Sequence, residues 1–139
     1  MFKTHSIMFY PNSSRSKRWD AIKETLCEWV AKRPEPKIWN NSLRSHIYVG
    51  SKTRGELPYW GSKNPLSTEA ICKHFTEIMR FAVKTGEVEP HSRSGKGYTK
   101  LIILERSIPG IGTAKMTVGV NPHNGQLMGY CITVPPAAA

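Results

Sequence analysis

The last third of the chain constrains the fold more than any other part of the sequence. Residues 98–105 and 113–120 are rich in β-branched and apolar side chains, and the second segment alternates apolar with polar positions. A third such segment, residues 126–134, follows the pair Asn124-Gly125, which favours a two-residue hairpin turn. The sequence therefore predicts three consecutive strands that form an antiparallel meander.

Two helices are predicted upstream of these strands. Apolar residues recur at helical spacing over residues 16–32 and again from Ser67 to Ala82, with Thr85-Gly86 ending the second helix. Between them, residues 45–49 fit either a brief strand or the end of a helix. The Gly- and Pro-rich residues 51–65 are predicted to form a loop.

Helices that precede an antiparallel meander define an α+β protein, with N-terminal helices packed on the C-terminal β-meander. We expect a single domain over residues 1–139. Within it, residues 1–44 form an N-terminal helical extension, residues 45–134 form the core, and residues 135–139 form a short tail.

The charge balance points to a polyanionic partner. The chain has 20 Lys+Arg against 10 Asp+Glu, a formal net charge of +10, which favours nucleic acid ahead of an anionic membrane or an acidic protein. Only Glu105 falls in the predicted strands, whereas a two-metal nuclease needs several converging carboxylates. We therefore expect no metal and no cofactor.

The sequence also bears on the compartment. No apolar run is long enough to span a membrane, and residues 1–10 show no signal-peptide pattern. The three cysteines form no C-x-x-C pair, which predicts buried free thiols and a reducing environment. The expected location is the cytoplasm, of either a producing or a target cell, with no membrane partner.

Metal-free cleavage of RNA needs a base, an acid, and donors that stabilise the charged phosphorane. The first candidate for the acid or base is His46, which lies close to Arg44. Lys115, with Lys100 or Arg93, is the candidate for stabilising the phosphorane, and Tyr130 and Thr133 are candidates for orienting the phosphate or ribose. Simple strand alternation places Tyr130 and Thr133 on opposite faces, so both reach one site only through a bulge or at the end of the strand.

Further residues are candidates for binding nucleic acid. They are Arg44, Arg54, Trp60, His91, Arg93, Lys96, Lys100 and Thr117. His91 is the second choice for a catalytic histidine. Trp60 and its neighbour Tyr59 either stack on bases or pack at the edge of the core. Lys115 and Thr117 share one strand face, a pattern that an ordinary solvated sheet surface would also show.

The order of these segments resembles the barnase/EndoU/colicin/RelE-like group of metal-independent ribonucleases. It is most similar to bacterial EndoU-type toxin domains and their phage-encoded relatives, which carry a His-Ile/Leu-x-x-Gly segment. That segment reads His46-Ile47-Tyr48-Val49-Gly50 here, and the likeness extends over residues 45–134. EndoU-type domains also carry a histidine in the glycine-rich loop, where this chain has Tyr59-Trp60-Gly61.

The resemblance implies a metal-independent endoribonuclease of the toxin or phage-effector type. It would cleave RNA, with tRNA among the candidate targets, and leave a 2′,3′-cyclic phosphate. An acidic antitoxin or immunity protein is the expected protein partner. The alternatives are a non-catalytic, basic nucleic-acid-binding module and a phage-type inhibitor protein.

Overall fold

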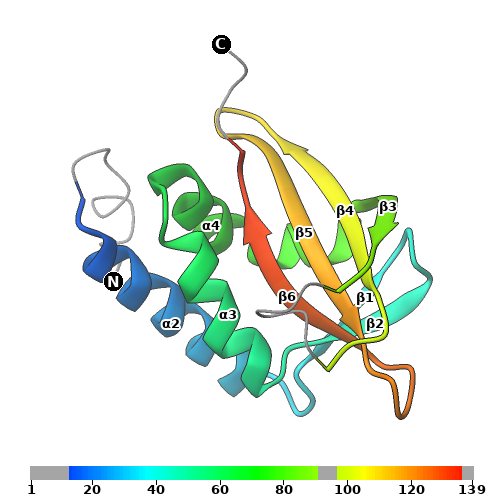
Figure 1. Cartoon of the computed structure of the whole chain (residues 1–139). Coiled ribbons are helices and arrows are strands. Elements are labelled where there is room, and N and C mark those ends of the chain that lie inside the picture. The colour runs from blue at the N-terminus through cyan, green and yellow to red at the C-terminus, as the bar shows by residue number, and fades with distance from the viewer. Residues whose placement is uncertain (1–12, 91–96, 136–139) are drawn as a thin grey trace.

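The computed structural model describes residues 13–90 and 97–135. Figure 1 shows the helices on one side of a curved sheet, with α3 running beside strand β6. The elements are α2 (Arg15–Ala31), β1 (Lys37–Asn40), β2 (Ser45–Tyr48), α3 (Ser51–Gly61), α4 (Pro65–Phe81), β3 (Val83–Val88), β4 (Leu101–Ile108), β5 (Gly112–Val120) and β6 (Leu127–Thr133). The α+β class predicted from the sequence is confirmed.

The sheet differs from the prediction in its extent and in its strand directions. It has six strands in the order β1-β2-β6-β5-β4-β3, and β2 pairs with β6 in parallel while the other pairs are antiparallel. The predicted meander β4–β5–β6 is present, but earlier strands flank it on both sides. The expectation of helices first and a purely antiparallel sheet second is therefore wrong.

One strand of the sheet lies within the expected N-terminal helical extension. Strand β1 lies within residues 1–44, yet it pairs with β2 along its whole length, from Lys37 opposite Tyr48 to Asn40 opposite Ser45. The boundary therefore falls inside a hairpin. Each strand has only four residues, too few to give a clear periodic signal in the sequence.

Helix α2 forms as predicted, because local capping and apolar spacing agree. Its N-cap is Ser14, whose Oγ accepts a hydrogen bond from the Lys17 amide at 3.2 Å. Helix α4 ends at Phe81, earlier than expected, and β3 occupies the place of its last predicted turn. The pair Thr85-Gly86 therefore lies within a strand, and the sequence signal for a helix end was misleading.

Helix α3 replaces the predicted loop over residues 51–65. Pro58 lies inside the helix and cannot donate the backbone hydrogen bond expected at its position. Tertiary contacts compensate, because Leu57 and Pro58 are buried and the Thr53 hydroxyl donates to the Gly129 carbonyl of β6. The same hydroxyl accepts from the Gly50 amide at 3.1 Å and so caps the helix.

The hydrophobic core lies between the helices and one face of the sheet. Leu104, Met116 and Ile132 are opposed in register across β4, β5 and β6, and all three are buried. Helix α4 packs against this face, and α2 packs across α3 and α4. The residues between these buried positions point to the opposite side, which we call the open face.

Asn40 is fully buried and connects β1 to the C-terminal end of α4. Its Nδ2 donates to the Met79 carbonyl at 2.9 Å and to the Ala82 carbonyl at 3.1 Å. Its Oδ1 accepts from the Leu43 amide at 2.7 Å. One side chain therefore holds the β1–β2 hairpin against the C-terminal end of α4.

Replacing Asn40 should destabilise the fold strongly. Each buried group left without a partner costs about 1–3 kcal/mol, so we expect Asn40→Ala to lower the free energy of unfolding by about 2–4 kcal/mol. Urea denaturation measures this change. The control is Asn41→Ala, since Asn41 is exposed and only its backbone amide bonds to α4. Equal effects of the two substitutions would contradict the role given to Asn40.

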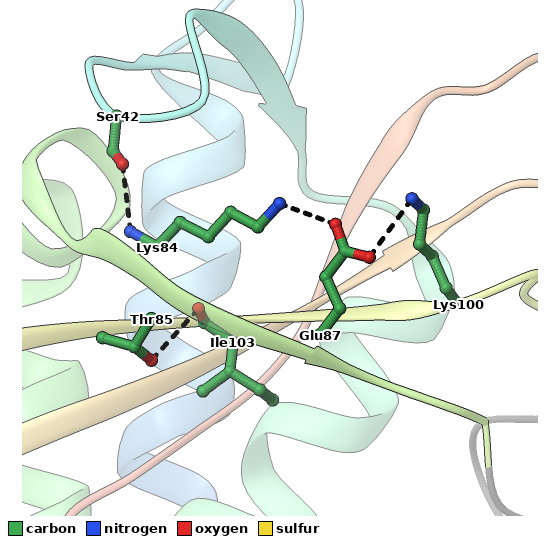
Figure 2. A network of polar contacts seen from close by, with 6 residues as sticks. All are labelled: Ser42, Lys84, Thr85, Glu87, Lys100 and Ile103. Atoms are coloured by element: carbon green, nitrogen blue, oxygen red, sulfur yellow. Dashed lines mark hydrogen bonds and ion pairs between the residues drawn. The ribbon is translucent and has the colours of Figure 1, made fainter.

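The other edge of the sheet, β3, is held by polar contacts that Figure 2 shows. The Glu87 carboxylate binds the Lys84 ammonium at 2.6 Å and the Lys100 ammonium at 3.4 Å, and these partners lower the pKa of Glu87. The Lys84 amide donates to Ser42 Oγ at 3.0 Å, which links β3 to the β1–β2 turn. These charges are exposed, so they contribute little to stability.

Candidate nucleic-acid site on the open face of the sheet

The open face carries one row of three polar residues. Glu105 on β4 is opposed to Lys115 on β5, and Lys115 is opposed to Thr133 on β6. Directly opposed residues share a face, with Cβ atoms about 5 Å apart. Glu105 and Lys115 are exposed and Thr133 is half-buried, so a carboxylate, an ammonium and a hydroxyl stand side by side.

A register shift brings Tyr130 to the same face. Thr117 is opposed to Cys131 while Val118 is opposed to Gly129, so Tyr130 is an extra residue in β6. Its ring contacts the Tyr98 ring, with centroids 5.9 Å apart. Tyr98 in turn covers Gly119, where an added Cβ would lie 2.5 Å from the ring. A bulge, one of the two arrangements that the sequence allowed, is therefore present.

Helix α3 adds a carboxylate and an indole to this surface. Trp60 Nε1 donates to Glu56 Oε1 at 3.0 Å, and both side chains are half-buried. The charge of Glu56 helps to raise the pKa values of Tyr98 and Tyr130, which indicates that it lies near both rings. Lys52, one turn earlier, has its Nζ 4.5 Å from the centroid of the Tyr98 ring.

The Tyr130 hydroxyl is the unusual group in this cluster. Tyr130 is 2% exposed, and within the described part of the chain its hydroxyl has no partner at hydrogen-bonding geometry, although Trp60 lies close enough to oppose the rise in its pKa. Burial first, and the charge of Glu56 second, raise the pKa of the phenol well above its ordinary value. Tyr130 is therefore a neutral hydrogen-bond donor and not a base.

Removing this hydroxyl tests whether folding needs it. Because an unpaired buried hydroxyl is unfavourable, Tyr130→Phe should leave the free energy of unfolding unchanged or raise it by about 1 kcal/mol. Tyr130→Leu is the matched control and should destabilise the chain, since it removes the ring that packs on Tyr98. Chemical denaturation of both variants measures the difference. Destabilisation by the phenylalanine variant would show that the hydroxyl has a structural partner.

The cysteines are not equally buried. Cys27 is exposed, against the expectation of a buried thiol, whereas Cys72 and Cys131 are largely covered. Burial raises the pKa of the Cys131 thiol to about 11, and the nearby Thr117 and Lys115 offset this only in part. The thiol is protonated at neutral pH, so Cys131 is not a nucleophile of this site.

Alkylation should follow this order. N-ethylmaleimide near neutral pH should modify Cys27 first and leave Cys72 and Cys131, whose pKa values are both about 11, largely unmodified. Raising the pH toward 11 should accelerate modification of the two covered thiols, because the thiolate fraction rises. Peptide mapping by mass spectrometry gives the rates. Rapid labelling of Cys131 at neutral pH would contradict its burial.

The structure does not bring His46 to this row. Ile47 of β2 pairs with Leu127 at the start of β6, whereas Thr133 ends that strand. At about 3.3 Å per residue, His46 is about 20 Å from Thr133 along β6. The expected cleft between the His46 segment and the row is therefore absent. The sequence did not indicate the position of His46, because the parallel pairing of β2 with β6 joins segments that are far apart in the chain.

The other candidate residues divide into three groups. Thr117 and Trp60 lie near Tyr130 on the open face, and Thr117 is 7% exposed. Arg44 and Arg54 are exposed elsewhere, and Lys100 binds Glu87. His91, Arg93 and Lys96 lie outside the described residues.

Sequence reasoning missed Glu105, Glu56 and Tyr98 as members of the site. Glu105 is the single acidic residue between residues 97 and 134, and in the sequence it bears only on the argument against a metal site. Strand alternation from Leu101 indicates which face of the sheet Glu105 lies on. Its position opposite Lys115 depends on the length of the turn between β4 and β5. The sequence predicts a loop at Glu56, and nothing in that pattern indicates that this residue lies near β6.

Among residues 13–90 and 97–135, no three His, Cys, Asp or Glu side chains gather closely enough to hold a metal ion. The helices described are too short or too polar to cross a membrane. No family model, curated protein or solved structure matches the chain.

Proposed function

We propose that this chain is a metal-independent endoribonuclease whose reactive groups lie on the open face. The observation that carries the proposal is the row Glu105–Lys115–Thr133, with Tyr130 added by the bulge. A proton acceptor, a cation and hydroxyl donors are the groups that such cleavage requires. The net charge of +10 supports an anionic substrate.

In this proposal each group has a defined role, and Lys115 has two. The Glu105 carboxylate takes the proton of the ribose 2′-OH, and the freed oxygen attacks phosphorus. The Lys115 ammonium stabilises the phosphorane and donates a proton to the departing 5′-oxygen as the P–O5′ bond breaks. Thr133 donates a hydrogen bond to a phosphate oxygen, as does Tyr130 once the substrate reaches its hydroxyl. The product carries a 2′,3′-cyclic phosphate.

The mechanism requires RNA, because DNA lacks the 2′-OH that attacks. The toxin or phage-effector role, a tRNA target and an acidic antitoxin or immunity protein are parts of the same proposal. They derive from the resemblance to the barnase/EndoU/colicin/RelE-like group. An acidic partner that covers the open face would block Lys115 and Thr133 together.

Substitution of the row tests the mechanism. We expect Lys115→Met and Glu105→Gln each to lower kcat by about 100-fold or more, since each removes one group that acts in the transition state. The free energy of unfolding should change little, because both side chains are exposed. The control is Lys23→Met, an exposed lysine on α2, which should leave cleavage unchanged.

Activity should persist in EDTA, and the products should end in 2′,3′-cyclic phosphate. Full loss of cleavage in EDTA, or products with a 3′-hydroxyl, would refute the mechanism. Unchanged cleavage rates in both Lys115→Met and Glu105→Gln would show that neither residue takes part in the reaction.

A non-catalytic RNA-binding module is the second candidate function. It is favoured by one observation: in the described part of the chain, no histidine lies beside the Glu105–Lys115–Thr133 row. Binding and cleavage measured on one panel of RNAs separate the two functions. Salt-sensitive binding without turnover would favour the module.

A further inference from the structure

A cluster of basic side chains lies at the β1 edge of the sheet, near the C-terminal ends of α2 and α4. It comprises Arg33, Lys37, Trp39, His46 and Arg80, and we call it the edge cluster. These side chains line a hollow of about 380 Å³. The cluster contains His46, which the structure places far from the Glu105–Lys115–Thr133 row.

The edge cluster carries an excess of positive charge. Among the described residues that line the hollow, Glu35 is the one carboxylate, and it binds Lys37 at 3.0 Å. Arg33 is half-buried, and burial, followed by the positive charge of Arg80, lowers its pKa. Two guanidinium groups held close together repel one another, so an anion in the hollow would be stabilised by both.

Contacts within the fold hold the Arg33 side chain and the backbone of Arg80 in place. Arg33 donates to the Trp29 carbonyl at 3.0 Å, and its guanidinium carbon lies 3.7 Å from the centroid of the Trp29 ring. Arg80 belongs to the end of α4 that Asn40 ties to β1, and its carbonyl accepts from the Asn41 amide at 3.0 Å. A preorganised cation loses less entropy when it binds a phosphate.

Trp39 gives the cluster an aromatic surface. Its side chain is 46% exposed, unusual for a tryptophan, and it meets the His46 ring edge-on with centroids 5.3 Å apart. Exposed aromatic rings beside cations are the features with which proteins bind single-stranded nucleic acid, through base stacking and phosphate contacts.

The Trp39 and His46 side chains of the edge cluster lie on the same face of the sheet as the row, whereas Arg33 and Arg80 reach the β1 edge from the helix side. Ile38 and Ile47 are opposed and buried in the core, so their neighbours Trp39 and His46 point to the open face. The distance along β6 is about 20 Å, which a few nucleotides of single-stranded RNA can span.

We propose that the edge cluster is a second RNA subsite, which binds phosphates of a single-stranded segment with Arg33, Lys37 and Arg80 and stacks one base on Trp39. The identity of the ligand rests on the proposed function. The subsite makes substrate length a determinant of affinity. RNA long enough to reach from the row to Trp39 binds tightly, and a dinucleotide occupies the row alone.

The experiment compares a dinucleotide with a single-stranded RNA of about 15 nucleotides, near the upper size for such sites. Trp39→Ala and Arg80→Gln should each raise the Kd of the long RNA at least about fivefold and leave cleavage of the dinucleotide unchanged. Arg80→Gln should also lower the slope of log K against log salt by about 0.7, whereas Trp39→Ala should not. Trp39→Phe should restore most of the affinity, and Lys23→Gln is the control for loss of one exposed charge.

The outcomes distinguish this subsite from the catalytic proposal. If the long RNA binds the Trp39 and Arg80 variants as tightly as the unchanged chain, the subsite is refuted even if Lys115→Met abolishes cleavage. If no RNA is cleaved but both variants weaken binding, the subsite stands and the catalytic proposal fails. If the long RNA does not bind the unchanged chain, both are refuted.

Discussion

The arrangement of the molecule depends on how little of β6 is paired with β2. Strand β5 bonds to β6 along most of its length, whereas β2 pairs with it only at Leu127 and Met128. Backbone groups inside a domain must find partners, and α3 lies beside the remaining edge of β6, where Thr53 satisfies the Gly129 carbonyl. A helix has taken the place that a longer strand would occupy.

The positions of both clusters follow from the replacement of a strand by a helix. Helix α3 brings Glu56 and Trp60 beside β6, near the bulge at Tyr130 in the middle of that strand. The short strand β2 pairs only with the start of β6 and carries His46 there. A longer parallel pairing would have removed α3 from the sheet, and the open face would then hold no carboxylate from a helix.

The accuracy of the sequence predictions depended on the range of the interactions involved. Helix α2 and the strands β4 to β6 were predicted because apolar spacing, caps and turns agree locally. Helix α3 was missed because Gly55 and Pro58 oppose a helix locally, and only burial against α2 and β6 stabilises it. Strand β3 was missed because Thr85-Gly86 has the composition of a helix end.

The same reasoning applies to the candidate site. Lys115 and Thr133 lie on adjacent strands of one hairpin, so a local pattern was enough to suggest that they meet. Tyr130 reaches the site through a bulge that the sequence permits but does not specify. His46 reaches the sheet through a parallel pairing between residues 80 positions apart, such as Ile47 and Leu127, and no local signal encodes it.

The edge strands also affect how the molecule behaves at high concentration. An exposed strand edge can pair with another chain, and the exposed Val83 and Val88 would make β3 prone to such pairing. Lys84 and Glu87 place charges along this strand, and its register shifts between Lys84 and Gly86. At the opposite end, β1 offers only four residues. Both ends are therefore poor templates for a seventh strand, which protects a highly basic protein from edge-to-edge aggregation.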